Sequence, residues 1–217
     1  MKIPNMIYGT AWKKENITDL VFEALKQGFK AIDTACQPKH YREDLVGLGL
    51  LKAYEIGIKR QDLFIQTKFT PVDGQDQSNM PYLASDEIEI QVEKSFETSK
   101  KNLHTDFINA YILHSPVFPG TKLQRVWQKM EEFYDKKEVG QLGISNCYDL
   151  DVLKYLYNNA KVKYEKSVAE IFYRFLNHIN ITPLNGTTSI KHMIEDLKIG
   201  EFELTNDEIE EISKFII

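Results

Sequence analysis

Short apolar runs alternate with amphipathic stretches along most of the chain. The runs are rich in β-branched and aromatic residues, so they predict strands. These predicted strands are residues 6–12, 29–35, 63–69, 107–114 and 139–145. Each is followed by a stretch with the helical period, at 17–28, 43–56, 86–102, 122–137 and 149–159. Because several runs are apolar on both faces, they favour a parallel sheet covered by helices, either open or closed into a barrel.

Individual residues mark the helix ends that this pattern predicts. Gly28 closes the first helical stretch, where a left-handed C-cap favours glycine. Asp149 follows the fifth strand and can cap the next helix through its carboxylate. The predicted strands begin near residues 29, 63, 107 and 139. They therefore recur every ~30 to 45 residues, which is the length of a βα unit.

The alternation breaks after residue 145. The helical stretch 149–159 is followed by a second one at 167–178, and only the short run 180–184 after it has strand character. The segment "AKVKY" (160–164) is the one candidate for a degraded strand between the two helices. Two successive helices are anomalous in an alternating fold, so this region predicts a departure from regular βα architecture.

Composition and charge exclude several classes of protein. Apolar residues make up 42% of the 217 residues and charged residues 27%, which is typical of a globular chain. The net charge of −5 comes from interspersed acidic and basic residues, so no basic face predicts a nucleic-acid partner. No apolar run approaches the ~20 residues that a membrane span needs.

The two cysteines, Cys36 and Cys147, are too few and too far apart to predict a disulfide framework. Each is expected to be a small buried apolar residue. A soluble protein in the reducing cytoplasm is the expectation that agrees with this cysteine usage.

Three ionisable residues lie at or just past the carboxyl ends of predicted strands: Asp33, Lys68 and His114. Alone, each has a structural explanation, as a capping carboxylate, an edge lysine or a core histidine. In parallel α/β folds, however, catalytic groups collect at this edge because the βα loops converge there. Together the three residues predict an active site.

Tyr41, in the loop after Asp33, completes the predicted chemistry. A tyrosine donates a proton readily when a nearby cation lowers its pKa, and Lys68 is the available cation. Asp33 can hold the ammonium group, and His114 can orient a carbonyl oxygen or share in proton delivery. A general acid of this kind suits reduction of a carbonyl to an alcohol with hydride from a nicotinamide.

Four segments carry a specific resemblance: "GFKAIDTACQPKHYRED", "LFIQTKF", "YILHSP" and "VGQLGISN". In this order they resemble the successive active-site segments of the aldo-keto reductase family. The resemblance implies a TIM-type (β/α) barrel in which Asp33, Tyr41, Lys68 and His114 form the catalytic tetrad. It extends to about Lys163 and resumes from about Ser167.

The resemblance also implies a cofactor site. Ser145 and Asn146 would bind the nicotinamide carboxamide, next to Asp33. The segment "ITPLNGTTSIKHMIEDL" resembles the family's last strand and adenosine-binding helix, so further residues would surround the adenosine: Thr187, Thr188, Ser189, His192, Glu195 and Asp196. NADPH is the expected cofactor. NADH stays open, because Gly186 and His192 stand near places where the family carries Lys and Arg for the 2′-phosphate.

The sequence departs from the family pattern in two places. Asp33 and Tyr41 are farther apart than is usual, so the inserted residues must loop out. The family's strands six and seven have no counterpart between Lys163 and Ser167, which predicts one domain over 1–217, an internal deletion near 163–167 and about six of eight strands. The open edges would be covered by pairing of strand 139–145 with strand 180–184, by a second copy of the chain, or by a ligand or partner protein.

Two functions follow from this reading, together with the chance that the sequence record lacks a middle segment. The first is an NAD(P)H-dependent oxidoreductase that reduces an aldehyde or ketone, a small-molecule substrate. The second is a catalytically impaired binding or scaffold protein, favoured by the missing cofactor contacts. Aromatic residues expected near the pocket mouth suggest an apolar or aromatic carbonyl: Tyr8, Trp12, Phe69 and Phe118.

Overall fold

One parallel sheet organises the molecule in the computed structural model, which describes residues 3–152, 154, 184–185, 188 and 190. Its strands are β1 (Ile7–Gly9), β2 (Ala31–Asp33), β3 (Phe64–Phe69), β4 (Ala110–Leu113), β5 (Leu142–Ile144) and β6 (Leu184–Asn185). The order in the sheet is β5-β4-β3-β2-β1-β6, and every pairing between these strands is parallel. The predicted α/β class is confirmed.

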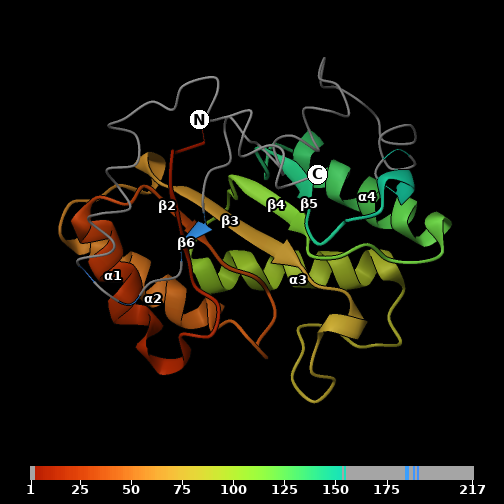
Figure 1. Ribbon diagram of the computed structural model, residues 1–217, viewed down its shortest axis with the longest axis horizontal. Helices are drawn as coiled ribbons and strands as arrows, with labels where there is room; N and C mark the ends of the chain where they lie inside the picture. The colour runs from red at the N-terminus through yellow and green to blue at the C-terminus, as the bar shows by residue number, and fades with distance from the viewer. Residues whose placement is uncertain (1–2, 153, 155–183, 186–187, 189, 191–217) are drawn as a thin grey trace, which may run out of the picture.

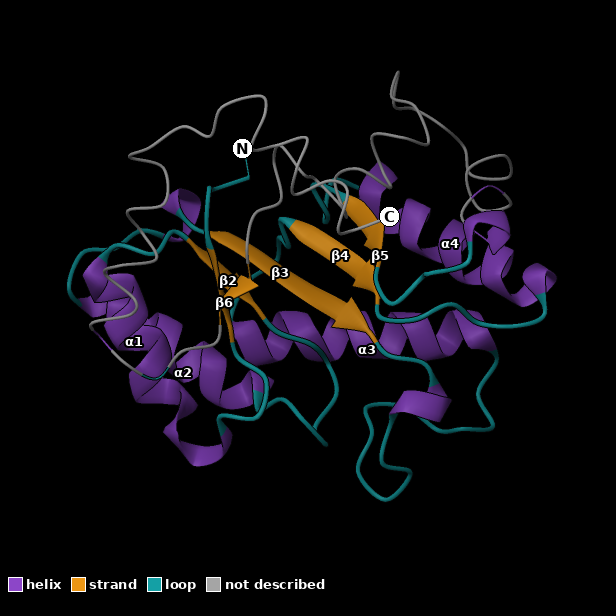
Figure 2. Ribbon diagram, in the orientation of Figure 1, coloured by secondary structure: helices purple, strands orange, loops and turns teal. Residues whose placement is uncertain are grey.

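The helices follow the outside of this sheet from one edge toward the other (Figures 1 and 2). They are α1 (Ile17–Gln27), α2 (Glu43–Glu55), α3 (Ile88–Leu103) and α4 (Gly120–Asp135), with short 3₁₀ turns at Lys14–Asn16, Arg60–Asp62 and Val72–Gly74. Each of α1 to α4 packs against the next in chain order. This succession of strand and helix is that of a TIM-type barrel.

Both predicted cap residues end or begin a helix as expected. Gly28 has a φ of 113° and ends α1 in the left-handed conformation. Asp149 Oδ1 accepts hydrogen bonds from the backbone N–H groups of Asp151 at 2.8 Å and Val152 at 3.4 Å. A helical stretch therefore begins at Leu150, directly after this cap.

Alternate residues of each strand point to opposite faces of the sheet. On the outer face, Tyr8, Ile32, Ile65 and Tyr111 join the large apolar core beneath the helices. On the inner face, a second cluster contains only Ile7, Ala31, Phe64 and Ala110 as fully buried members. Asp33 and Lys68 share the inner face, because they follow Ala31 and Phe64 by even numbers of residues.

The described residues contribute six strands to one parallel sheet, and in them the direct closure, one of the two expected ways to cover the edges, is not present. β5 and β6 are at opposite ends of the sheet order, so strand 139–145 is not paired with strand 180–184 in the described part of the chain. One edge of β6 pairs with β1, as the last strand of a barrel does. The expectations for 160–164 and 167–178 lie outside the described residues. No described helix is long and apolar enough to cross a membrane.

Candidate active site

The predicted catalytic residues meet at the carboxyl end of the sheet. Asp33 is the last residue of β2, Lys68 lies near the end of β3, and His114 directly follows β4. The backbone N–H of His114 donates to the Phe69 carbonyl at 2.8 Å, which extends the β3–β4 ladder into the site. The convergence that parallel strands predict is therefore present.

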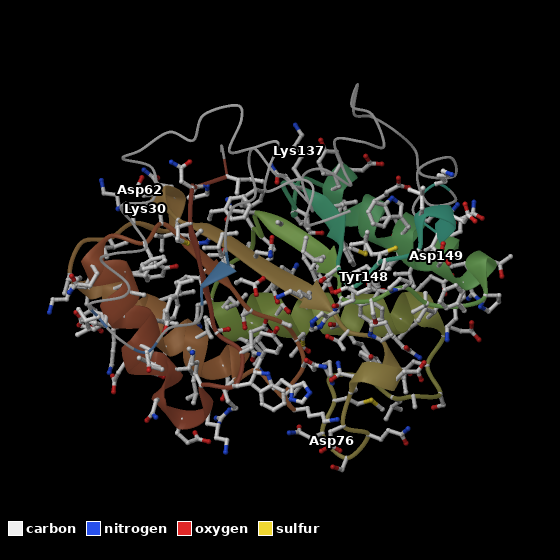
Figure 3. The ribbon with its side chains drawn as sticks, viewed as in Figure 1. Lys30, Asp62, Asp76, Lys137, Tyr148 and Asp149 are labelled. Atoms are coloured by element: carbon white, nitrogen blue, oxygen red, sulfur yellow. The ribbon has the colours of Figure 1, made fainter. Side chains whose placement is uncertain are left out.

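Side chains drawn in Figure 3 show which end of the sheet this is. Lys30 and Asp62 precede β2 and β3 and lie toward one end, whereas Asp76 follows β3 and lies toward the other. The catalytic candidates belong to the end on the Asp76 side, where the strand-to-helix loops lie.

Asp33 and Lys68 form a buried ion pair. Lys68 Nζ donates to both carboxylate oxygens of Asp33, each at 2.6 Å, and to the Thr34 carbonyl at 2.8 Å. Only 2% of the Asp33 side chain and 8% of the Lys68 side chain are exposed, so solvent does not screen the pair. Gln66 Nε2 also donates to Asp33 Oδ1, at 2.6 Å. The carboxylate therefore fixes the ammonium in place, as predicted.

Tyr41 returns to this pair in spite of its distance along the chain. The residues between Asp33 and Tyr41 make a tight turn, in which the backbone N–H of Tyr41 donates to the Gln37 carbonyl at 2.9 Å. The Tyr41 ring then lies with its centroid 5.2 Å from Lys68 Nζ and 6.0 Å from the centroid of the His114 ring. The inserted residues loop out as expected, and all four tetrad side chains come together.

The pKa of Tyr41 moves in the direction opposite to the expectation. Burial raises the pKa of the phenol above its usual range, and the negative charge of Asp33 raises it further. The predicted lowering by Lys68 is therefore wrong for this arrangement, because Lys68 directs its N–H groups to Asp33 and Thr34. Tyr41 consequently holds its proton firmly.

His114 is held as a neutral ring. Burial lowers the pKa of His114 to about 4, and the positive charges of Lys68 and His40 act in the same direction. Its Nδ1 is 2.7 Å from Thr70 Oγ1, which fixes the orientation of the ring. A neutral imidazole whose Nδ1 accepts from Thr70 carries its proton on Nε2 and can donate it to a carbonyl oxygen.

Ser145 and Asn146 continue the site across the end of β5. The Ser145 N–H donates to the Leu113 carbonyl at 2.8 Å, and the Asn146 side-chain amide donates to the His114 carbonyl at 2.8 Å. Asn146 has a φ of 51°, a left-handed conformation that asparagine tolerates better than most residues. The Asn146 side chain therefore joins the loop after β5 to the loop that carries His114, and Ser145 directly precedes it.

The expected adenosine-binding residues are mostly outside the described part of the chain. Thr188 is described and is exposed. The others lie outside the described residues: Thr187, Ser189, His192, Glu195 and Asp196. Among the described residues, no group of three or more His, Cys, Asp or Glu side chains could hold a metal ion.

Comparison with known sequences agrees with this geometry. The family model described as "Aldo/keto reductase family" matches residues 5–165. The chain belongs to the aldo/keto reductase family. Glyoxal reductase of Bacillus subtilis is 31% identical over 147 residues, which are 67% of this chain and 45% of that protein. The NAD(P)H-dependent D-xylose reductase of Pachysolen tannophilus is 26% identical over 75% of this chain and 54% of its own length.

Solved structures of aldo-keto reductases share the fold. An aldo-keto reductase enzyme from a deep-sea metagenome library of the Medee basin has a TM-score of 0.74 at 20% identity, covering 99% of this chain and 92% of that one. The Bombyx mori aldo-keto reductase in complex with NADP has a TM-score of 0.67 at 20% identity, covering 98% and 89%. The chain thus has the aldo-keto reductase fold, although it spans about half the length of the two reductases described above.

The structure corrects the expectation for the aromatic residues at the pocket mouth. Tyr8 and Phe69 are fully buried in the outer core, where Tyr8 packs edge-on against Phe29 with centroids 5.5 Å apart. They are wrong as mouth residues because they point to the outer face of their strands. Trp12 and Phe118 are 67% and 68% exposed, and the Trp12 ring lies 3.8 Å from that of His40.

Two residues of this aldo-keto reductase site were missed by sequence reasoning. Gln66 holds Asp33, and Thr70 holds His114. Gln66 could have been found from its position two residues before Lys68, since residues i and i+2 of a strand share a face. Thr70 gives no comparable signal, because it lies beyond the strand end, where periodicity no longer applies.

Proposed function

We propose that the protein reduces an aldehyde or ketone to an alcohol with hydride from NADPH, with NADH as the alternative donor. The observation that carries the proposal is the buried Asp33–Lys68 ion pair, which lies within reach of the Tyr41 and His114 rings. The family includes reductases of small carbonyl compounds such as glyoxal and D-xylose, which supports a small-molecule carbonyl as the substrate.

Each tetrad residue has a separate part in the proposed proton transfer. Tyr41 is the general acid: its raised pKa keeps the phenol protonated, and no described side chain hydrogen-bonds its hydroxyl. The neutral His114 donates a hydrogen bond to the substrate oxygen and so orients the carbonyl. Lys68 stabilises the phenolate that remains after the proton leaves, and Asp33 holds Lys68.

The described residues fit the nicotinamide end of the cofactor. The Asn146 amide uses its nitrogen on the His114 carbonyl, which leaves its oxygen to accept an N–H of a carboxamide. Ser145 is half-buried next to it, and its hydroxyl can donate to the carboxamide oxygen. The bound cofactor supplies hydride to the carbonyl carbon. Thr188 belongs to the proposed adenosine site together with the residues outside the described part: Thr187, Ser189, His192, Glu195 and Asp196.

The shortened barrel is part of the same proposal. We infer one domain over 1–217 with a deletion near 163–167. The end of the family match at residue 165 supports the deletion. An alignment with an uncharacterized oxidoreductase of Caenorhabditis elegans also supports it, because the alignment runs over 274 positions and is therefore longer than this chain. β5 and β6 are the outermost strands of the sheet, which supports a second copy of the chain as the cover of the open side. The buried free thiols of Cys36 and Cys147 support a cytoplasmic location.

A second candidate function is favoured by one specific observation. In the described part of the chain, the acceptors of Lys68 Nζ belong to Asp33 and Thr34, and the ammonium makes no hydrogen bond to Tyr41. A protein that keeps this pair only to hold its strands together would be a binding or scaffold protein with the barrel's first half intact.

A comparison of two tyrosine substitutions tests the proposal. Tyr41→Phe removes the proton donor and should lower kcat for a reactive aldehyde such as 4-nitrobenzaldehyde by ~10² to 10⁴. Tyr54→Phe is the matched control, because Tyr54 lies toward the other end of α2 and its buried hydroxyl makes no hydrogen bond to any residue that the structure describes. NADPH consumption measures the rate, and quenching of protein fluorescence measures cofactor affinity.

The outcomes separate the two candidate functions. If Tyr41→Phe loses the rate while its NADPH affinity stays at the wild-type value, Tyr41 is the general acid. We expect that affinity to be weak, with a Kd above roughly 10 μM, since each ~1.4 kcal/mol of missing contact weakens binding tenfold. Equal rates in the wild type and Tyr41→Phe would remove the assigned role. A wild type that consumes neither NADPH nor NADH would favour the scaffold function.

A further inference from the structure

One level of the inner face contains a polar side chain that the tetrad does not include. The residues that share this level across β1 to β4 are Gly9, Asp33, Gln66 and Ala110. Glycine and alanine have no polar side-chain group. Within this row, a side-chain hydrogen bond can form only between Gln66 and Asp33, and it is present at 2.6 Å.

The hydrogen bonds of Asp33 are divided unequally between its two oxygens. Oδ1 accepts from both Gln66 Nε2 and Lys68 Nζ, each at 2.6 Å, whereas Oδ2 accepts, among the described side chains, from Lys68 alone. Gln66 lies two residues before Lys68, so both side chains leave β3 on the same face. Oδ1 therefore keeps one hydrogen bond whatever Lys68 does.

The Lys68 ammonium is fully engaged in this arrangement. It has three N–H groups, and three acceptor oxygens lie within 2.8 Å: Asp33 Oδ1, Asp33 Oδ2 and the Thr34 carbonyl. When Tyr41 gives its proton to a carbonyl oxygen, the phenolate that remains needs a donor in this buried site. Lys68 can supply it only by turning one N–H away from Asp33 or Thr34.

We propose that Gln66 is a positioning residue that lets the Lys68 ammonium turn from Asp33 Oδ1 to the Tyr41 oxygen during proton transfer. This inference rests on the proposed function. The proton step breaks the Tyr41 O–H bond and forms an O–H bond on the substrate oxygen. The electron pair for the new bond comes from the C=O π bond, which opens as the carbonyl carbon receives the hydride that its donor gives up. Without Gln66, rotation of the Lys68 ammonium would leave the buried Asp33 Oδ1 without a hydrogen-bond donor among the described residues. Leaving a buried acceptor unsatisfied costs free energy. With Gln66, that oxygen stays hydrogen-bonded and the carboxylate keeps its orientation.

The test removes the donor and keeps the length of the side chain. Gln66→Met should lower kcat for 4-nitrobenzaldehyde by about 10- to 100-fold, the effect of a lost hydrogen bond to a charged group, with KM nearly unchanged. Among the described residues, the charged and titratable groups around the Tyr41 ring are Asp33, Lys68, His114 and the adjacent His40. Carboxylates and imidazoles ordinarily titrate below pH 7, so the alkaline limb of the kcat profile reports the phenol. It should move to higher pH in Gln66→Met, because a phenolate without Lys68 forms less readily.

Gln91→Met is the matched control. Gln91 is a buried glutamine on α3 that donates to the backbone carbonyls of Ala84 at 3.3 Å and Asp86 at 2.9 Å. It should leave kcat and the alkaline limb at their wild-type values. If Gln66→Met does not give folded protein, Gln66→Glu replaces it, since it keeps the shape and exchanges the donor for an acceptor. It should lower kcat at least as much and shift the limb in the same direction.

Two results would overturn the inference while leaving the proposed function intact. One is an unchanged kcat and alkaline limb in Gln66→Met. The other is a rate that falls equally at every pH without a shift of the limb, because that is the behaviour of a residue that only packs. A wild type without NADPH- or NADH-dependent reduction would instead remove the proposed function, and the inference with it.

Discussion

The two faces of the sheet come from alternate residues of the same strands, and they differ in what they bury. The outer face carries large aromatic and aliphatic side chains, such as Tyr8 and Tyr111, under α1 to α4. The inner face carries few large apolar groups and buries the Asp33–Lys68 pair instead. Neighbouring residues show the division most clearly. Thr67 donates to the buried carboxylate of Glu43 on the outer face, whereas Lys68 binds Asp33 on the inner face.

This difference shows how one sheet can separate stability from chemistry. The outer face contains a buried carboxylate too, but Glu43 is surrounded by hydroxyl and amide donors from Thr67, Ser99 and Asn102. Burial raises the pKa of Glu43, and these three donors to it are uncharged. Asp33 has a cation as its partner. A carboxylate among neutral donors holds elements together, whereas one that holds a cation can serve proton transfer.

The largest loss of stability is expected on the outer face. Phe96 is fully buried, stacks on Phe133 with centroids 4.2 Å apart and meets Tyr111 edge-on at 4.9 Å. Phe96→Ala should reduce the free energy of unfolding by about 3–5 kcal/mol through lost burial and the cavity left behind. Urea denaturation measures it. Leu83→Ala is the control, since Leu83 is 62% exposed and should change stability by less than about 0.5 kcal/mol.

The next effect concerns the inner-face ion pair. Lys68→Met leaves the Asp33 carboxylate buried without a cation, and this should cost about 3–5 kcal/mol of unfolding free energy. Adding Asp33→Asn removes the uncompensated charge and should recover most of that loss, although reduction stays abolished. Stability that recovers without activity would sharpen the contrast between the faces. A double variant no more stable than Lys68→Met would contradict it.

A smaller, pH-dependent effect is expected from His114. Its folded-state pKa of about 4 lies below the ordinary 6.5, so between these pH values the unfolded chain binds more protons than the folded one. Stability should therefore fall as the pH drops from 6.5 to about 4, by about 2 kcal/mol once partial exposure is taken into account. His114→Gln should remove this part of the pH dependence. Urea midpoints of both proteins across this range measure it, and parallel curves would refute the assignment.

The smallest effect is expected at Thr70, which orients the His114 ring. Thr70→Val keeps the shape of the side chain and removes the hydroxyl 2.7 Å from His114 Nδ1. It should therefore lower the free energy of unfolding by about 1 kcal/mol. Thr70→Ser keeps the hydroxyl and serves as the control. Nitrogen NMR of the imidazole should show a change of tautomer population in Thr70→Val alone. The same spectrum in all three proteins would mean that another contact fixes the ring.

The positions of three of the proposed catalytic residues could be predicted because topology determines them. Asp33, Lys68 and His114 each lie at or next to the end of a strand, and parallel strands present these ends at one edge. The alternation of strands and helices was equally readable, although the strand predicted at 6–12 is shortened to Ile7–Gly9. Its remaining residues continue into the loop that carries Trp12.

The electrostatic state of the site could not be predicted in the same way. The pKa of Tyr41 depends on burial and on where the Lys68 N–H groups point, and neither is a property of sequence spacing. Tyr8 and Phe69 were misplaced at the pocket mouth for a related reason. A residue's face on a strand depends on register, and the sequence does not specify register when both faces are apolar.

The Asn146 side chain couples the loop after β5 to the loop that carries His114. One amide nitrogen ties the loop after β5 to the His114 carbonyl in the loop after β4. A ligand that orders Asn146 thereby also orders the backbone that carries the imidazole. Thermodynamic reciprocity then requires that a ligand that orders His114 raises the affinity of a ligand at Asn146 by the same factor. Under the proposed function, occupancy of the nicotinamide position and alignment of the substrate carbonyl would thus be linked through a single amide group.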